Sequence, residues 1–340
     1  PACFYDVAIQ VAIIRPGPIH GQAKNPYLAR RNGEAPITYF DERARPILER
    51  TLGVVLFQEQ VLALAMTLGG FSPDEADELR RAIGFTRQPE RLDRLKTKLR
   101  AAMTARAVSN TAAEHILEAL GSFALYGFPE SHALSFALIA YGAAWLKVHR
   151  TVEFYAGLLN NQPMAFYSPA TLVQDARRRG IGISPVCVAT SEIKTTVESD
   201  QRLQLGLCLV KGLRVDAAES IIRVRGEKPF ASVADLLRRA DLNEKERRLL
   251  ASIGALNAVA GTRREALWAV SRQDLQDDLF SLAEAKDESA SLLTPMPLPE
   301  RIAQDFAITG VTTGAHPMKH LRSQMPDLWR ADELALAEPG

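Results

Sequence analysis

The chain has 340 residues, of which 47% are hydrophobic and 24% are charged. That length is enough for two or three domains, and that composition is typical of an ordinary globular protein. The formal net charge is only +1, so the total charge does not indicate a nucleic-acid partner. Three scattered cysteines support neither a disulfide framework nor a zinc site.

No apolar run is long enough to cross a membrane and no signal peptide is visible, so we expect a cytoplasmic protein without a membrane partner. The chain starts at Pro1, within an apolar segment, and we expect it to be a piece of something longer. Charge is uneven along it. Residues 76–106 hold nine Lys or Arg against four Asp or Glu, whereas residues 274–288 are acidic. A local basic face on a neutral chain fits contact with phosphate on one side only.

Helical patterns dominate the first half of the chain. Val7–Ile14 is an apolar strand or helix that ends at the rigid turn Arg15-Pro-Gly-Pro18. Ser72-Pro-Asp-Glu75 predicts a strong helix start, with Ser72 as N-cap and Glu75 closing a capping box. Further helices are predicted over 46–52, 58–68, 90–106, 111–124, 133–149, 151–160 and 168–179.

The sequence pattern changes from helical to alternating after Ser184-Pro185. Thr195–Glu198 and Leu203–Val210 alternate well enough to predict a β-hairpin around Ser199-Asp200. The pattern is then helical again to about residue 272. Residues 273–300 are acidic and contain three prolines, which predicts a linker, and the last forty residues form a partial unit.

A Gly/Pro loop precedes the long apolar helix that runs to His149. Pro129, Glu130 and Ser131 are all residues that helix starts favour. Unpaired N–H groups at such a start suit an anion such as phosphate, with Ser131 and His132 at that end. A capped core helix is the alternative, and this stretch alone favours it.

Arg80 and Arg81 form a basic pair in a predicted helix. Arginine suits phosphate because its planar fork donates bidentate hydrogen bonds. Adjacent helix residues diverge by about 100°, so we expect one arginine to hold a triphosphate while the other contacts nearby backbone. The alternative is a solvated basic helix face, which spacing alone favours.

Two glycine-bearing turns lie between amphipathic helices about forty residues apart: Leu209-Val-Lys-Gly-Leu213 and Ser252-Ile-Gly-Ala-Leu256. The pattern resembles a tandem helix-hairpin-helix, whose turns let backbone N–H groups approach a DNA phosphate without reading sequence. The candidate DNA contacts are Lys211, Gly212, Arg214, Ile253, Gly254, Arg263 and Arg264, and Arg223, Arg225, Arg247 and Arg248 could supplement them.

The acidic linker contains Gln276-Asp-Asp-Leu279-Phe280, the shape of a peptide that docks on a bacterial sliding clamp. In such a peptide the Gln276 amide would anchor the peptide on the clamp, and Leu279 and Phe280 would fill a groove of the clamp. The alternative is that Leu279 and Phe280 pack on the body of the protein. The sequence has no Walker A motif, no G-x-G-x-x-G loop, no Asp-x-Asp and no metal-ligand grouping of histidines with carboxylates. No catalytic or metal-binding residue is therefore assigned.

Several motifs occur in the order and spacing of bacterial C-family DNA polymerases, the polymerase III α subunits. They are Arg15-Pro-Gly-Pro18, Phe57-Gln-Glu-Gln-Val61, Glu75-Ala-Asp-Glu-Leu-Arg-Arg81, Tyr126-Gly-Phe128 with Ser131-His-Ala133, and Trp145-Leu-Lys147. The loop Phe128-Pro-Glu-Ser-His132 stands where the replicative enzyme usually has Phe-Asn-Lys-Ser-His. Together with residues 159–169 and 174–178, it resembles the error-prone, damage-inducible paralogue.

The resemblance implies a mainly α fold with four parts. These are polymerase fingers over 1–185, a small β-hairpin with a tandem helix-hairpin-helix over 186–272, a linker over 273–300, and the start of a truncated C-terminal region over 301–340, leading toward an oligonucleotide-binding barrel. In the family the metal-binding aspartates lie in a palm domain before the fingers. We therefore expect this segment to bind no cofactor itself and to be inactive alone, with Mg²⁺ held elsewhere in the full-length enzyme.

The family's fingers close over the incoming nucleotide. By motif match, Arg80 and Arg81 are the best candidates for triphosphate contacts, and Ser131, His132 and Lys147 are weaker ones. The implied activity is DNA-directed nucleotidyl transfer from dNTP to a primer 3′ end, in translesion synthesis and damage-induced mutagenesis.

The implied partners are primer-template DNA and dNTP, with the sliding clamp and companion proteins of a damage-inducible mutagenesis cassette as further candidates, at the nucleoid of a bacterial cytoplasm. The alternative function is a non-catalytic helix-hairpin-helix scaffold in a repair complex. An accessory domain of a nuclease or ligase fits the finger motifs less well.

Overall fold

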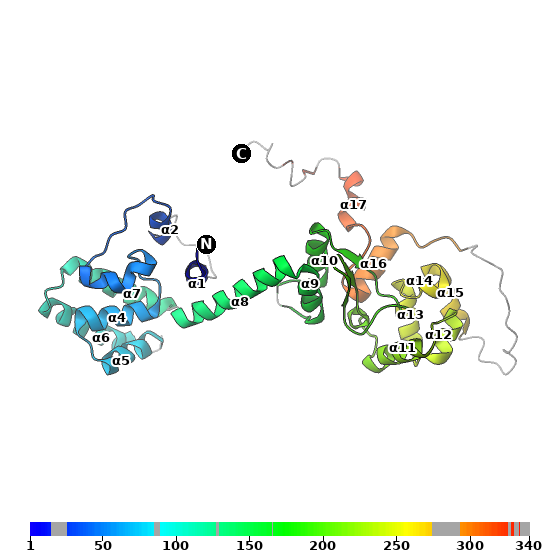
Figure 1. Cartoon of the computed structure of the whole chain (residues 1–340), viewed down its shortest axis with the longest axis horizontal. Coiled ribbons are helices and arrows are strands. Elements are labelled where there is room, and N and C mark those ends of the chain that lie inside the picture. The colour runs from blue at the N-terminus through cyan, green and yellow to red at the C-terminus, as the bar shows by residue number, and fades with distance from the viewer. Residues whose placement is uncertain are drawn as a thin grey trace. The chain divides into compact units, whose positions relative to one another are not determined.

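The computed structural model describes residues 1–14, 26–84, 89–126, 129–164, 166–273, 293–325, 328–329 and 333. These residues divide into two compact units, unit 1 (Pro1–Ala144) and unit 2 (Trp145–Gly340), and the division falls inside α8 (Glu130–His149) (Figure 1). The turn predicted at Arg15–Pro18 lies outside the described residues.

Unit 1 is helical throughout its described part. It contains α1 (Phe4–Ile13), α2 (Pro26–Arg31), η1 (Glu42–Ala44), α3 (Arg45–Leu48), η2 (Glu49–Thr51), α4 (Gln58–Gly69), α5 (Pro73–Gly84), α6 (Pro89–Ala105), α7 (Asn110–Tyr126) and the start of α8. The apolar segment that could be a strand or a helix is the helix α1. Its start is fixed by Asp6, whose carboxylate accepts hydrogen bonds from the backbone N–H groups of Ala2 and Cys3.

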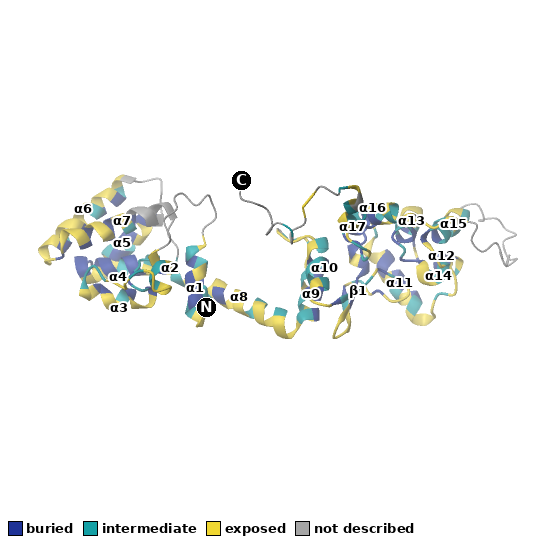
Figure 2. Cartoon of the chain, turned by 90° about the horizontal axis from the view of Figure 1, so that it is seen from above, coloured by how far each residue is buried: buried dark blue, intermediate teal, exposed yellow. Residues whose placement is uncertain are grey.

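The main core of unit 1 lies among α4, α5, α6 and α7. Leu64 and Leu68 of α4, Leu79 of α5, Leu99 of α6 and Ile116 of α7 are almost completely buried there. Figure 2 shows buried segments on α4 and α5, with exposed residues on the outer sides of the same helices. This distribution is the amphipathic pattern that surface helices require.

A smaller core joins α1 to the first turns of α8. It contains Ile9 of α1, Ala133 and Ala137 of α8, and Phe57, which precedes α4. The small alanines let α8 approach closely, so this core positions the N-terminal end of α8 against the rest of unit 1.

Unit 2 combines helices with a small sheet. It contains α9 (Thr151–Asn160), α10 (Pro169–Arg178), β1 (Gly182–Ser184), β2 (Thr196–Ser199), β3 (Arg202–Gln204), η3 (Leu207–Leu209), α11 (Val215–Glu227), α12 (Val233–Arg239), α13 (Glu244–Ser252), α14 (Asn257–Ala260), α15 (Arg263–Gln273), α16 (Leu298–Thr309), α17 (Pro317–Leu321) and η4 (Arg322–Gln324). The mainly α fold with a small β-hairpin is thus confirmed.

The sheet has the strand order β1-β3-β2. Strands β2 and β3 pair antiparallel around Ser199, as the predicted hairpin requires. Strand β1, which the sequence pattern does not predict, pairs parallel with β3 and places Ile183 opposite Leu203. Strand β3 is shorter than predicted because the chain turns into η3 at Leu207.

One continuous core runs through unit 2. It includes Val152 of α9, Leu203 of β3, Ile221 of α11, Leu250 of α13 and Ile308 of α16. The compact units therefore differ from the domain boundaries predicted at 185/186 and 300/301. Residues 151–185 and α16 share the core of the helices α11–α15, and α16 begins inside the stretch predicted as linker.

Candidate nucleic-acid interface

Arg80 and Arg81 lie toward the end of α5. The start of this helix is fixed by the predicted capping box: Ser72 N donates to the Glu75 carboxylate at 2.8 Å, and Glu75 N donates to the Ser72 hydroxyl at 3.3 Å. The two arginine side chains are 52% and 62% exposed. They are therefore accessible to a ligand from solution.

Both guanidinium groups reach the carboxylate of Asp77. The nitrogen–oxygen distances are 2.7 Å from Arg80 and 2.8 Å from Arg81. The divergence expected for adjacent helix residues does not separate them, because each side chain is long enough to bend back by one turn. The hydrogen bond from Arg80, with the charges of both arginines, holds the pKa of the Asp77 carboxyl below its usual value. The pair can thus hold a single oxyanion between them.

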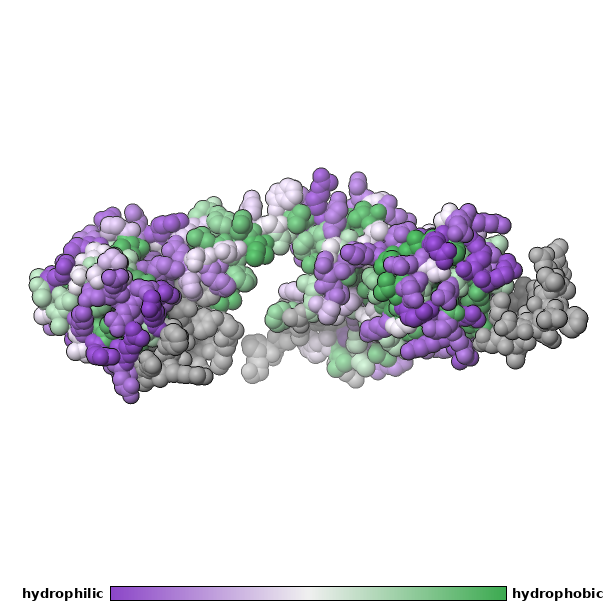
Figure 3. All heavy atoms as spheres, turned by 90° about the horizontal axis from the view of Figure 1, so that it is seen from below, coloured by the Kyte–Doolittle hydropathy of each residue, from purple (hydrophilic) through white to green (hydrophobic). Residues whose placement is uncertain are grey.

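Other acids of α5 pair with bases of α6. Glu75 contacts Lys98 at 2.6 Å, and Glu78 contacts Arg91 at 3.2 Å. Hydrophilic residues cover much of the surface of unit 1 in the view of Figure 3. Exposed ion pairs of this kind contribute little stability and are screened by salt. The basic face predicted over 76–106 is therefore partly neutralised, but by partners that an incoming anion could displace.

A carboxylate of the protein itself is bound at the N-terminal end of α8. The Glu59 carboxylate, from α4, accepts a hydrogen bond from Glu130 N at 2.8 Å. A negative charge is favourable there because the helix dipole is positive at this end. Ser131 and His132 are exposed beside it, and the His132 ring lies 4.5 Å from that of Phe136. The Glu59 carboxylate thus occupies one of the backbone N–H groups that the sequence pattern assigns to a phosphate.

Tyr5 connects α1 to the same helix end. Its hydroxyl donates to the Glu130 carboxylate at 2.6 Å, and the Arg50 guanidinium lies 3.6 Å from its ring centroid. Burial, with the neighbouring Glu130, raises the pKa of Tyr5 above its usual value. The phenol therefore stays a donor at any physiological pH and holds Glu130 in place.

Lys147, the third weaker candidate, belongs to unit 2. Its ammonium contacts the Asp175 carboxylate at 2.8 Å, and the Tyr155 hydroxyl donates to the same oxygen at 2.5 Å. The hydrogen bond that Lys147 donates to the Asp175 carboxylate raises the pKa of Lys147. This arrangement joins α8 to α9 and α10, so Lys147 has a structural partner in this structure.

The first glycine turn is built as predicted. Gly212 has φ +90°, in the left-handed region that favours glycine. Lys211 N donates to the Ile308 carbonyl at 2.9 Å, so a backbone hydrogen bond connects the turn to α16. The Lys211 and Gly212 side of the turn is exposed.

Arg214, just before α11, is held by acids. Its Nε contacts the Glu246 carboxylate at 2.9 Å, and Asp216 lies 3.0 Å from its Nη1. Glu246 is fully buried and also accepts from Arg214 N and Asn243 N. Burial opposes its charge, but the hydrogen bonds from Arg214 and Asn243 outweigh burial and lower the pKa of Glu246. Arg214 therefore joins the two hairpins to one another.

The second glycine turn faces inward over much of its length. Gly254 has φ +78°, and a Cβ added there would lie 2.9 Å from Arg263 Nε and 3.0 Å from Asn257 Nδ2. Ile253 is buried in the core of unit 2. The need for glycine at this turn is thus explained by side chains of the protein itself.

Arg263 and Arg264 have different surroundings. Arg263 is buried and contacts Asp305 at 2.8 Å, whereas Arg264 is only half-buried and pairs with Glu300 at 2.8 Å. Burial assigns Arg263, like Ile253, to the packing of unit 2 rather than to a surface that DNA could reach. Arg264 stays accessible beside its partner.

Within each unit, only some of the predicted site residues lie together. Arg80 and Arg81 share one carboxylate, and Lys211 and Gly212 share one turn, but Lys147 belongs to a separate cluster. The proposed clamp residues Gln276, Leu279 and Phe280 lie outside the described residues.

Sequence reasoning missed the acids that organise these sites. They are Glu59, Asp77, Glu246 and Asp305. Two had a readable signal: Asp77 precedes the arginines by three and four residues, and Asn243-x-x-Glu246 is a capping box. The contacts of Glu59 and Asp305 with distant elements have no local signal.

Comparison with known families agrees with this geometry. Residues 1–107 match the family model of the bacterial DNA polymerase III alpha subunit finger domain, and residues 180–266 match that of the helix-hairpin-helix motif. The chain thus carries a segment similar to the finger domain of the bacterial DNA polymerase III alpha subunit, followed by a helix-hairpin-helix region.

Its similar relatives are more specific. The chain is 44% identical over 338 residues to the error-prone DNA polymerase of Azoarcus sp. (strain BH72), covering 96% of this chain and 32% of the relative. It is 43% identical over 347 residues to that of Pseudomonas aeruginosa PAO1, covering 100% and 33%. Error-prone DNA polymerase 1 of Agrobacterium fabrum (strain C58) is 43% identical over 347 residues, with 96% and 32% covered. The resemblance to the error-prone paralogue is thus confirmed, and the chain spans about a third of the length of these relatives.

No group of three or more His, Cys, Asp or Glu is arranged to hold a metal ion within the described ranges. Among the helices that the structure describes, none combines the length and the apolar character that crossing a membrane needs.

Proposed function

We propose that this chain is the finger and helix-hairpin-helix part of an error-prone, DNA-directed DNA polymerase. In this proposal, unit 1 binds the triphosphate of the incoming dNTP through Arg80 and Arg81, and unit 2 binds primer-template DNA. The convergence of both guanidinium groups on the Asp77 carboxylate carries the proposal, since it lies within the residues that match the finger domain.

The chemistry asks for positive charge at this place. In nucleotidyl transfer the primer 3′ oxygen attacks the α-phosphorus, and the bond from that phosphorus to the pyrophosphate oxygen breaks. Negative charge then grows on the leaving pyrophosphate, and fixed arginine donors stabilise it. Arg80 and Arg81 would exchange the Asp77 carboxylate for the phosphate oxygens.

Mg²⁺, which the family resemblance implies, supplies Lewis-acid stabilisation when bound. The described residues contain no group that fits such an ion. We therefore propose that residues of the full-length protein outside this chain hold it, and that the chain alone does not extend a primer.

Ser131, His132 and Lys147 are further candidates for contacts with the triphosphate. Ser131 and His132 are accessible at the start of α8, next to Glu59. Lys147 would have to leave Asp175 to reach a phosphate. We therefore rank Ser131 and His132 above Lys147.

The partners follow from the family and the hairpins. We propose sequence-independent contacts with DNA phosphates by the Gly212 turn and Lys211, which is the role that a helix-hairpin-helix turn serves. We also propose the sliding clamp as a partner of Gln276–Phe280, and companion proteins of a mutagenesis cassette, acting at the nucleoid in the bacterial cytoplasm.

Equilibrium binding of a fluorescent dNTP analogue to the chain tests the nucleotide role. Each lost charged hydrogen-bond partner should weaken binding by about tenfold, so the double variant Arg80→Gln/Arg81→Gln should bind far more weakly than the wild type. Arg100→Gln is the matched control, because Arg100 is 54% exposed and also pairs with one carboxylate, that of Glu114. Equal affinity of the double variant and the control would overturn the proposal.

A further inference from the structure

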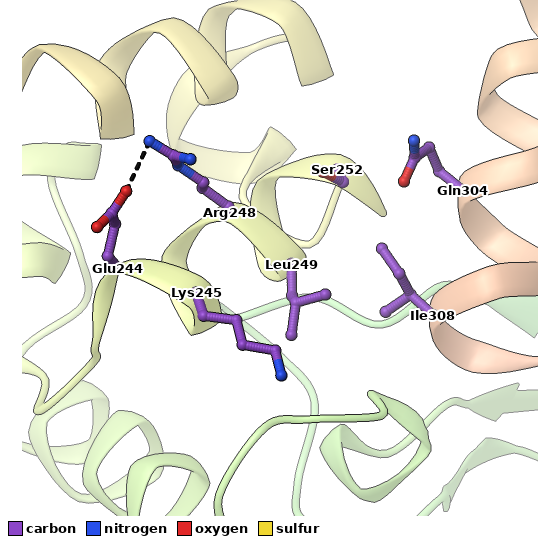
Figure 4. A pocket seen from close by; sticks show the side chains of 7 residues that line it. All are labelled: Glu244, Lys245, Arg248, Leu249, Ser252, Gln304 and Ile308. Atoms are coloured by element: carbon purple, nitrogen blue, oxygen red, sulfur yellow. Dashed lines mark ion pairs between the residues drawn. The ribbon is translucent and has the colours of Figure 1, made fainter.

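An open groove of about 410 Å³ lies between α13 and α16, next to the first glycine turn. Figure 4 shows Lys245 and Leu249 on the α13 side and Gln304 and Ile308 on the α16 side. Residues 180–266 contain the helix-hairpin-helix match, so the α16 wall lies outside that motif. We call this feature the α13–α16 groove.

Lys245 lines the groove close to the first glycine turn, and Lys211 lies in that turn with its Nζ 3.9 Å from the position that a Gly310 Cβ would take. Lys245 Nζ lies 3.8 Å from the position that a Gly212 Cβ would take, and Leu249 Cδ1 lies 3.2 Å from it. Lys211, the neighbour of Gly212, bonds through its backbone N–H to the carbonyl of Ile308, which lines the groove. A Cβ at Gly212 would be in ordinary contact with Lys245, whereas Leu249 at 3.2 Å would have to move, so Lys245 lies within contact distance of the turn.

The arginines near the groove are occupied. Arg214 pairs with Glu246, Arg248 with Glu244, and Arg264 with Glu300. Lys211 and Lys245 are exposed, and the structure shows an ion pair for neither of them within the described part of the chain. The positive charge available to an external anion at this place is therefore that of the two lysines.

The groove also has an apolar floor. Leu249 and Ile308 face one another across it, and the Gln304 amide stands on the α16 wall (Figure 4). Cationic rims beside an apolar floor suit a chain that alternates phosphates with less polar sugars. None of the described residues that line the groove is an aromatic residue that could stack on a base, so the chemistry of the groove favours the backbone of a strand over its bases.

We propose that the α13–α16 groove holds one sugar–phosphate strand of DNA, with Lys245 and Lys211 on its phosphates. This inference rests on the proposed DNA-binding function, which it deepens. It adds Lys245 and Gln304 as contact residues, and it extends the DNA-binding surface from the first hairpin onto α16.

The test measures fluorescence anisotropy of a labelled primer-template duplex with the whole chain between 50 and 200 mM salt. One phosphate contact contributes a slope of about 0.9 in log affinity against log salt, which is roughly a threefold change over this range. Lys245→Gln should therefore bind DNA more weakly than the wild type at 50 mM salt. The factor by which its affinity falls between 50 and 200 mM should be about three times smaller than the factor for the wild type. Lys228→Gln, an exposed lysine of the same unit at the end of α11, is the matched control.

A second variant addresses the groove itself. Gln304→Glu places a carboxylate on the α16 wall and should weaken DNA binding more than Gln304→Ala, which changes no charge. Thermal unfolding of each variant, compared with the wild type, checks that the fold is intact.

The inference would be overturned if Lys245→Gln bound DNA like Lys228→Gln and Gln304→Glu bound DNA like Gln304→Ala. Salt-dependent DNA binding by the wild type would in that case still support the proposed function. Failure of the wild type to bind DNA in a salt-dependent way would instead overturn the DNA-binding part of the proposed function, and the inference with it.

Discussion

Arg263 on α15 and Asp305 on α16 form an ion pair with a nitrogen–oxygen distance of 2.8 Å, and each side chain is only 9% exposed. The Asp305 carboxylate also accepts from the Thr312 hydroxyl at 2.8 Å, and Arg263 donates to the Ser252 carbonyl at 3.0 Å. A buried charge pair needs such additional hydrogen bonds to offset the loss of water. The pair fixes α16 to the helix-hairpin-helix region and so builds one wall of the α13–α16 groove.

Removal of one partner of this pair should be costly. Asp305→Ala leaves the Arg263 charge buried without its carboxylate, and we expect the free energy of unfolding to fall by about 3–5 kcal/mol. Urea unfolding of the chain measures the loss. Glu300→Ala breaks the partly exposed pair with Arg264 and should cost less than about 1 kcal/mol. Equal losses for the two variants would contradict the structural role given to Asp305.

Gln60 should be essential to the fold of unit 1. Its amide oxygen accepts from Leu56 N and Phe57 N, and its amide nitrogen donates to Thr51 and to the Ile47 carbonyl. Gln60→Ala leaves buried groups without partners, at about 3 kcal/mol in total. Thermal and urea unfolding should show this loss.

The neighbouring glutamine provides the control for that measurement. Gln58 is partly exposed, and Gln58→Ala should leave the free energy of unfolding nearly unchanged. A Gln60→Ala variant as stable as Gln58→Ala would show that the hydrogen bonds of Gln60 do not stabilise unit 1.

Asp6 should make the stability of unit 1 depend on pH. Hydrogen bonds from Arg31, and then from Ala2 N and Cys3 N, hold the pKa of Asp6 well below its usual value. Because the native pKa is depressed, the stabilisation is complete above the ordinary aspartate pKa of 3.8 and declines as the pH falls below it. The difference in Tm between wild type and Asp6→Asn should be equal at pH 7 and 5 and smaller at pH 3.

Asp93 offers a comparison for that titration. It is an exposed carboxylate on α6 for which the described residues show no ion pair. Asp93→Asn should change Tm little at any of the three pH values, and a difference for Asp6→Asn that grows toward pH 3 would have the wrong sign for our account.

Asp77 should compete with the nucleotide for its two arginines. Asp77→Asn removes the charge that Arg80 and Arg81 now share, and we expect the fluorescent dNTP analogue to bind about threefold more tightly, as for the release of an exposed ion pair. Glu78→Gln, which frees Arg91 instead, is the control. Weaker binding by Asp77→Asn would mean that Asp77 positions the arginines for the nucleotide rather than competing with it.

Local chemistry was enough to predict the elements that carry these residues. The Ser72 and Glu75 capping box predicts α5, and glycines with positive φ at 212 and 254 form the two predicted turns. The alternation around Ser199 predicts the hairpin of β2 and β3. Each of these signals lies within a few residues of the element it predicts, because capping and turn geometry are short-range effects.

Contacts between distant segments could not be predicted in this way. Burial of Arg263 depends on Asp305, and the anion at the start of α8 comes from Glu59, 71 residues earlier. Strand β1 is three residues long and is defined by its pairing with β3 rather than by its own pattern. The arginine-rich sequence therefore does not reveal that most of these arginines have partners within the protein, which are remote in sequence or lie one helical turn away.

The most direct test of the central claim is the dependence of primer extension on dNTP concentration in the full-length polymerase to which, in our proposal, this chain belongs. We predict that Arg80→Gln/Arg81→Gln raises the KM for dNTP by at least about tenfold and leaves the Kd for primer-template DNA unchanged, whereas Arg100→Gln changes neither. An unchanged KM, or a loss confined to DNA affinity, would contradict the assignment of Arg80 and Arg81 to the triphosphate.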